Sequence, residues 1–173
     1  MSQIIQCNLS QHSHQLAFID LLNHYISDDM GGGETLNRSK AEELFNQLNN
    51  QPNFRAFFIL YEGEVAGMIT TFKNISTFQV KPLINIHDVI VKKSYRNKGL
   101  GHKLVGFILD LAKNENCCRV NLEVREDNHR AMEVYRDFDF GPTNPKMVFW
   151  ERIIEDTEER IKSAATEEDL SND

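Results

Sequence analysis

Residues 83–101 read LINIHDVIVKKSYRNKGLG, and this stretch decides the fold of the chain. Its first half is an apolar segment, and a basic turn with Gly99 and Gly101 follows. Helical spacing of apolar residues begins at Leu100. A strand, a glycine-containing turn and a helix in this order present several backbone N–H groups to a phosphate, aided by the helix dipole. The stretch therefore predicts a phosphate-binding turn between a strand and a helix.

Two other phosphate-binding patterns do not fit this turn. A Walker motif requires a Gly, four residues, Gly and Lys, and the sequence lacks that spacing. A Rossmann motif requires a Gly, one residue, Gly, two residues and a third Gly, but Leu104 stands at the third glycine position. Both patterns are therefore excluded here.

A second informative block, residues 120–135, reads VNLEVREDNHRAMEVY. Apolar residues alternate with polar ones over its first part, which predicts a strand with one polar face. Asp127 or Asn128 can then cap a helix that carries Tyr135. The polar face of this strand and the helix after it are expected to lie near the phosphate turn.

Together the two blocks resemble the GCN5-related N-acetyltransferase (GNAT) superfamily. Its signature after the fourth strand is Arg or Gln, two residues, Gly, any residue, and Gly or Ala, and Arg96, Gly99 and Gly101 fill the three places. Asn128 and Tyr135 are a second, independent match. The resemblance implies an α/β fold with a mixed, mostly antiparallel sheet of about six or seven strands and helices on both faces.

The remaining segments predict further strands and helices around these blocks. We expect a strand over 2–9, a helix from Gln11 to about Tyr25, a helix capped by Asn37 or Ser39, and a hairpin of 54–61 with 65–72. Phe138, Phe140 and then 147–154 are expected to close the domain with one or two strands.

The 173-residue chain carries a net charge of −7, and its acidic groups gather near the C-terminus. Residues 151–173 hold nine acidic and three basic side chains, so they account for −6 of this charge. Length and composition predict one domain over 1–154 and an acidic tail over 155–173 that is partly disordered or a frayed helix. The basic residues around the glycine turn form a narrow positive focus, which suits a small polyanion and not nucleic acid.

Several classes of protein are excluded by composition. No apolar run approaches the ~18 residues of a membrane span, so no membrane partner is predicted. The first residues lack the basic and apolar parts of a secretory signal, and three cysteines do not make a disulfide framework. We therefore expect a cytoplasmic protein with reduced thiols. The six histidines have no Cys or Glu at ligand spacing, so no metal is predicted.

The resemblance implies acetyl-CoA as the cofactor, bound along the strand and the turn. Residues 96–102 would hold the diphosphate, and the strand before them would hold the pantetheine arm through its backbone. The cofactor-binding residues implied are Val89, Ile90, Val91, Arg96, Asn97, Lys98, Gly99, Leu100, Gly101, His102, Asn128 and Tyr135.

Two residues of the second block are predicted to carry the proton transfers. In relatives that acetylate protein N-termini, a Leu-Glu-Val strand is followed by Asn and Tyr, and Glu123 and Tyr135 stand at these places. By this resemblance Glu123 accepts the amine proton and Tyr135 protonates the departing thiolate. A base is needed because an amine of pKa ~10 is cationic at neutral pH.

His87 and Asp88 form an alternative base. They interrupt the apolar strand just before the cofactor-binding segment, and diamine acetyltransferases carry adjacent acids in a similar strand. His87 departs from that pattern, so the sequence leaves open a polyamine acetyltransferase and a buried structural pair.

The acyl acceptor is expected to meet an acidic loop. Asp28, Asp29 and Glu34 flank three glycines at 31–33, which predict a mobile or sharply bent link, and Tyr25 precedes them. Acidic side chains suit a cationic amine, so a small amine or polyamine is the expected substrate. A protein N-terminal or lysine acetyltransferase and a non-catalytic acyl-CoA-binding regulatory protein remain as alternatives, and a homodimer is left open.

Overall fold

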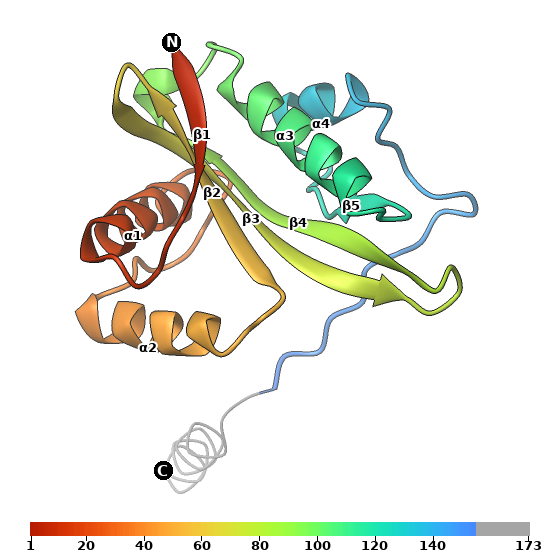
Figure 1. The fold of residues 1–173 in the computed structure, drawn as a ribbon, viewed down its shortest axis with the longest axis horizontal. Helices are drawn as coiled ribbons and strands as arrows, with labels where there is room; N and C mark the ends of the chain where they lie inside the picture. Colours follow the sequence, from red (N-terminus) through yellow and green to blue (C-terminus); the bar gives the residue numbers. More distant parts are fainter. Residues whose placement is uncertain (155–173) are drawn as a thin grey trace, which may run out of the picture. The chain divides into compact units, whose positions relative to one another are not determined.

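The computed structural model describes residues 1–154, and its first compact unit is Met1–Phe140. The elements of this unit follow one another along the chain as Figure 1 shows. They are β1 (Ser2–Gln6), α1 (His12–Ile26), α2 (Arg38–Asn49), β2 (Phe54–Tyr61), β3 (Glu64–Ser76), β4 (Lys81–Val91), the 3₁₀ helix η1 (Lys93–Tyr95), α3 (Leu100–Asn114), β5 (Val120–Leu122) and α4 (His129–Arg136).

The strands form one five-stranded sheet in the order β1-β2-β3-β4-β5. Neighbouring strands are antiparallel except for β4 and β5, which pair in parallel. Helices α1 and α2 cover one face, and α3 and α4 lie on the other (Figure 1). The prediction of a mixed, mostly antiparallel sheet with helices on both faces is confirmed.

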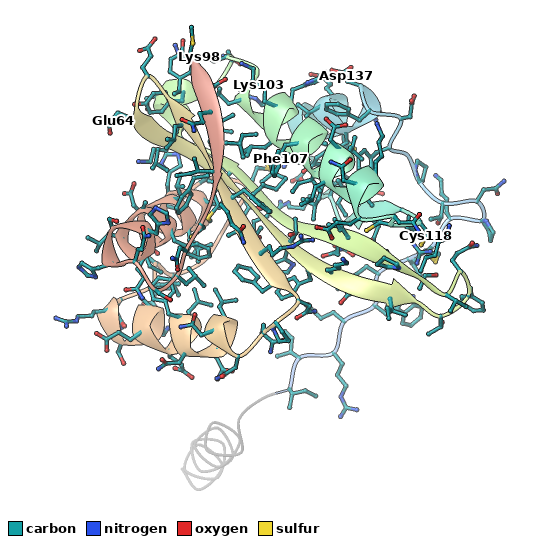
Figure 2. The ribbon with its side chains drawn as sticks, viewed as in Figure 1. Glu64, Lys98, Lys103, Phe107, Cys118 and Asp137 are labelled. Atoms are coloured by element: carbon teal, nitrogen blue, oxygen red, sulfur yellow. The ribbon has the colours of Figure 1, made fainter. Side chains whose placement is uncertain are left out.

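Each face of the sheet has its own hydrophobic core. The core under α3 includes Leu104 and Ile108 with residues of β2, β3 and β4, and Phe107 of the same helix packs against it (Figure 2). The core under α1 and α2 includes Phe18 and Phe45. Because both faces are buried, the middle of the sheet is a rigid base for the loops at its ends.

One extra residue in β4 exchanges the faces of its side chains. Thr70 pairs with Asp88 and Thr71 pairs with Ile86, so His87 is left over as a β-bulge. Before the bulge, Ile86 belongs to the core under α3, whereas Ile90 after it belongs to the core under α1. Because side chains alternate along a strand, Asp88 lies on the α1 face of the sheet together with Ile90.

Side-chain caps start two of the helices as the sequence predicts. Asn37 accepts a hydrogen bond from the Lys40 N–H at 3.0 Å at the start of α2, and Asn128 accepts one from the Ala131 N–H at 3.1 Å at the start of α4. Of the alternatives left open, Asn37 and Asn128 are therefore the caps, and Ser39 and Asp127 are not.

The C-terminal part of the domain differs from the expectation. Phe138 and Phe140 follow α4 in a turn, in which their N–H groups donate to the Tyr135 carbonyl at 3.1 Å. Residues 141–154 form no helix or strand, so the predicted strand over 147–154 is wrong, and within residues 1–154 the sheet has five strands instead of six or seven. Pro142 and Pro145 interrupt this segment, and a proline cannot donate a ladder hydrogen bond. The predicted tail, 155–173, lies outside the described residues.

An ion-pair cluster joins the end of α3 to the sheet. Glu115, just after α3, contacts the Arg55 guanidinium through both oxygens and the Lys73 ammonium at 2.7 Å. These partners, Arg55 first, lower the pKa of Glu115 from 4.5 to about 2.

Within residues 1–154, no helix is long and apolar enough to cross a membrane.

We expect Glu115→Gln to lower the free energy of unfolding by about 1–3 kcal/mol at pH 7, because it leaves two cations without their carboxylate. The pKa is depressed by folding, so this stabilisation is complete above pH 4.5 and is lost as the pH falls toward about 2. Urea unfolding at neutral pH and near pH 3 measures the change. Asp110→Asn, which removes an exposed carboxylate on α3, is the control and should change little. An equal loss at both pH values would contradict the ion-pair origin.

Candidate active site

The turn between β4 and α3 exposes a row of backbone donors. Asn97 (φ 63°) and Gly99 (φ 69°) are left-handed, and α3 begins directly after Gly99. Within residues 1–154, the N–H groups of 97–102 donate to no protein acceptor, whereas the next one, of Lys103, donates to the Gly99 carbonyl at 3.0 Å. These six amides surround the N-terminus of a 15-residue helix, so they make an anion-binding surface.

The space in front of the two glycines is open. A Cβ atom placed on Gly99 or on Gly101 would meet nothing within 4 Å. A ligand can therefore approach the backbone closely at both positions, which is what a diphosphate needs. The residues of the turn fit the diphosphate of a coenzyme A compound.

Two lysines supply positive charge at this turn without a carboxylate partner among the described residues. Lys98 lies over the Tyr61 ring with its Nζ 5.0 Å from the centroid, and Lys103 donates to the Ser2 Oγ at 2.7 Å. Figure 2 shows both lysines at the end of the molecule where α3 begins. In contrast, Lys92, Lys93 and Arg96 pair with carboxylates of α1 and the residues after it.

We expect Gly101→Asp to lower the affinity for acetyl-CoA by about 10- to 100-fold, because it places a carboxylate in front of the amides that would hold the diphosphate. The variant should fold, since Gly101 has room for a side chain and an acidic residue near a helix N-terminus is favourable. Isothermal titration calorimetry and a melting curve measure the two quantities. Gly101→Ala, which adds bulk without charge, should lose less affinity. Unchanged binding by the aspartate variant would place the diphosphate elsewhere.

Strand β4 continues beyond the point at which β5 leaves it. The parallel pairing ends at Ile86 with Leu122, while β4 runs on to Val91. The N–H groups of Asp88 and Lys92 donate to acceptors on β3, the Thr70 Oγ1 and the Ala66 carbonyl. Since backbone groups alternate along a strand, those of Val89 and the N–H of Val91 face the other side, where β5 has ended, while the Val91 carbonyl accepts from the Arg96 Nε at 3.2 Å. That side is open to an extended ligand chain.

The Asp88 carboxylate of β4 acts electrostatically on Tyr25 of α1 and on Tyr135 of α4. Burial raises the pKa of Tyr135 to about 12, with smaller contributions from Tyr25 and from Asp88. Burial and then Asp88 raise the pKa of Tyr25 as well. Both hydroxyls therefore keep their protons at neutral pH, and a carboxylate lies near them.

Asp88 is held in place by the neighbouring strand. The Thr70 hydroxyl donates to the Asp88 Oδ2 at 2.5 Å and accepts from the Asp88 N–H at 3.0 Å. The exposed His87 ring packs edge-on against Phe72, with 5.4 Å between the centroids. Of the two adjacent candidates for the base, Asp88 is the one whose charge acts on Tyr135.

Glu123 lies directly after β5 rather than within it, and its side chain is exposed. The Asn85 Nδ2 donates to its Oε2 at 3.2 Å. Val120 and Leu122 pack against the core under α3. Because side chains alternate along the chain, Glu123 lies on the α1 face of the sheet, where Asp88 also lies. Both candidate carboxylates therefore lie on one face of the sheet.

The carboxylates of the predicted acidic loop lie in different environments. Asp28 is nearly buried, and the Arg96 Nη2 donates to its Oδ2 at 2.7 Å. Asp29 is exposed, and Glu34 is exposed and lies 3.7 Å from the Lys40 Nζ. The structure thus brings Tyr25, but not Glu34, to the group around Tyr135.

Sequence reasoning missed three residues that arrange the site. They are His24, which accepts from the Lys93 N–H at 3.0 Å, Thr70, and Arg130, which donates to the Asn97 Oδ1 at 2.8 Å. Thr70 left a signal, because it is a polar residue in the middle of an apolar strand. His24 and Arg130 left none, since their partners are distant in sequence.

Comparisons with known proteins agree with this arrangement. Residues 18–140 match the acetyltransferase (GNAT) family. A putative ribosomal protein bS18-alanine N-acetyltransferase of Bacillus subtilis is 26% identical over 101 residues, which are 58% of this chain and 63% of that protein. The thialysine Nε-acetyltransferase of Bos taurus is 34% identical over 53 residues, 31% of each chain. The chain thus spans less than two thirds of either curated relative.

Solved structures share the fold across most of the chain. A probable acetyltransferase has a TM-score of 0.76 at 17% identity, with 89% of this chain and 99% of that chain covered. An aminoglycoside acetyltransferase from an uncultured soil metagenomic sample, in complex with sisomicin, has 0.72 at 20%, with 88% and 97% covered. A transcriptional regulator from Bacillus halodurans has 0.73 at 15%, with 88% and 100% covered. At these identities the likeness shows the fold alone.

Proposed function

Because the chain belongs to the acetyltransferase (GNAT) family, we propose that it transfers an acetyl group from acetyl-CoA to a primary amine, by direct attack in a ternary complex. The observation that carries the proposal is the row of amides at 97–102 that have no partner among the described residues and that follow β4, the strand that carries Asp88. A cofactor-binding turn and a pair of proton-transfer groups are what this reaction requires. No protein-bound acetyl intermediate is needed.

The chain's own backbone would hold the cofactor, which supplies the acetyl group as an activated thioester. The amides of 97–102 bind the diphosphate, and the backbone groups of Val89 and the N–H of Val91 face the pantetheine arm. An N–H group of β4, in the part of the strand after its pairing with β5 ends, would polarise the thioester carbonyl. The Val89 N–H suits this role better than that of Ile90, which faces β3 by the same alternation.

The side chains around Tyr135 would move the protons. Asp88 is the base in this proposal, because its carboxylate lies near Tyr135 and is oriented by Thr70, and Glu123 is the alternative on the same face. Tyr135 is the acid, since its pKa of about 12 keeps the hydroxyl protonated at neutral pH. An amine of pKa ~10 must lose a proton before it attacks, so the base is the more important of the two groups.

A small cationic amine or polyamine is the proposed acceptor. Asp88 and Glu123 present two carboxylates on the face of the sheet where the acceptor would lie. The names of the curated relatives include the Nε of thialysine and an alanine of ribosomal protein bS18, so a peptide acceptor is the alternative within the same chemistry.

The test is a turnover assay of the full chain with acetyl-CoA and a panel of acceptors. The panel contains spermidine, thialysine, an aminoglycoside and peptides with an N-terminal alanine or an internal lysine, and mass spectrometry measures free CoA and the acetylated products. Acetylation of a small amine at a rate above that of the peptides supports the proposal. Preference for a peptide would change the acceptor class. Binding of acetyl-CoA without release of CoA from any acceptor would favour a non-catalytic regulatory protein, and absence of binding would overturn the proposed function.

A further inference from the structure

Two side chains at and just after the end of α1 contact the segment that precedes the turn 97–102. Asp28 accepts from the Arg96 Nη2 at 2.7 Å and lies 3.5 Å from the Lys93 Nζ. His24, one turn earlier, accepts from the Lys93 N–H through Nε2 at 3.0 Å. The element that carries Tyr25 is thereby joined to the segment that leads into the amides of 97–102.

Backbone hydrogen bonds fix Asp28 at the end of α1. The Asp28 N–H donates to the Tyr25 carbonyl at 2.9 Å, the Gly31 N–H donates to the Asp28 carbonyl at 2.8 Å, and the Met30 N–H donates to the Asp28 Oδ1 at 3.4 Å. A Cβ atom on Gly31 would lie 2.1 Å from the Tyr25 carbonyl oxygen, so the chain can bend this tightly only with glycine at 31. The predicted glycine link is therefore sharply bent at this position, and it holds Asp28 against the end of α1.

The Arg96 side chain spans from β4 to Asp28. Its Nε donates to the Val91 carbonyl at 3.2 Å while Nη2 donates to Asp28, and only 8% of the Asp28 side chain is exposed. A guanidinium fixed at both of these points acts as a brace for the turn that follows it. Arg96 also lowers the pKa of Asp28, so the carboxylate stays charged at neutral pH.

We propose that Asp28 is a positioning residue, which through Arg96 holds the turn 97–102 in the conformation that binds acetyl-CoA. This inference rests on the proposed function and changes two sequence-based roles. Asp28 orders the cofactor turn rather than binding the amine, and Arg96 supports the turn through its side chain rather than contacting the diphosphate.

The first test replaces Asp28 by Asn, which keeps the shape of the side chain and removes its charge. We expect the Kd for acetyl-CoA, measured by calorimetry on the full chain, to rise about 10-fold, while kcat at saturating acetyl-CoA changes less than about threefold. The matched control is Asp20→Asn, because Asp20 of α1 also forms an ion pair near the turn, with Lys92 at 2.7 Å, but does not reach Arg96. The control should bind acetyl-CoA within about twofold of the unmodified protein.

A double-mutant cycle separates a brace from a direct phosphate contact. If Arg96 acts only as a brace held by Asp28, then Asp28→Asn, Arg96→Gln and the double variant all lose affinity to the same extent, because each breaks the same pair. If Arg96 contacts the diphosphate itself, Arg96→Gln loses clearly more affinity than Asp28→Asn, and if the two residues act independently, their losses add. Either of these outcomes overturns the inference. It is also overturned if Asp28→Asn binds as the unmodified protein does, or if it lowers kcat and affinity together with the melting temperature. Failure of the unmodified protein to bind acetyl-CoA would instead reject the proposed function.

Discussion

Replacing Asp88 by Asn is expected to lower kcat by roughly 10²- to 10⁴-fold, because the variant can no longer accept the proton of the attacking amine. The change is nearly isosteric, and Thr70 can still donate to the remaining carbonyl oxygen, so the sheet should stay intact. Initial rates at saturating acetyl-CoA and amine, measured from pH 6 to about 10, give the result. The loss should shrink as the pH approaches the pKa of the amine, since more of the acceptor is then already neutral.

Glu123→Gln is the comparison that decides between the two carboxylates. The variant should keep most of the activity, because Glu123 is exposed and contacts Asn85 rather than the group around Tyr135. The opposite outcome, a large loss for Glu123→Gln and a small one for Asp88→Asn, would assign the base to Glu123, as the resemblance to N-terminal acetyltransferases implies. Calorimetry with acetyl-CoA should show little change for either variant.

Tyr135→Phe is expected to lower kcat by roughly 10²- to 10⁴-fold with little loss of acetyl-CoA affinity, because it removes only the hydroxyl that protonates the leaving thiolate. The phenylalanine ring keeps its packing against Phe140, so stability should change little. With a pKa of about 12, Tyr135 does not deprotonate at moderately alkaline pH, so the unmodified enzyme should show no alkaline loss of rate from this residue below that value.

The same variant separates an enzyme from a binding protein. A regulatory protein that only binds acyl-CoA would need no acid, and its affinity and any basal release of CoA would be the same with phenylalanine at this position. If the unmodified protein turns over and Tyr135→Phe turns over equally fast, another group or water protonates the thiolate. In that case the role of Tyr135 is rejected while the proposed reaction stands.

The sequence predicts the central part of the fold well, because local signals determine it. The glycines, the apolar spacing and the caps place α3, α4 and the long strands without knowledge of the tertiary structure. The prediction of a strand over 147–154 is wrong for the opposite reason. Its composition is typical of a strand, but a strand also requires a partner with free backbone groups, and composition does not reveal whether one is available.

The candidate site is predicted only in part, because its contacts join residues far apart in sequence. The turn at 97–102 follows from motif spacing alone. Asp28 was predicted to bind substrate because acidic side chains on a loop suit a cationic amine, and nothing nearby indicates that Arg96, 68 positions later, holds it. The preference between Asp88 and Glu123 depends on the bulge in β4, which only the register of the sheet reveals.

The extra residue in β4 also constrains which sequence changes this protein can tolerate during evolution. Before His87, substitutions in β4 affect the packing of the core under α3. After His87, the same strand lies next to the candidate active site. A single-codon deletion there would exchange inward and outward for every later side chain of the strand, and Asp88 would move to the opposite surface of the sheet. The number of residues between Ile86 and Asp88 should therefore tolerate less variation than the identity of the residue between them.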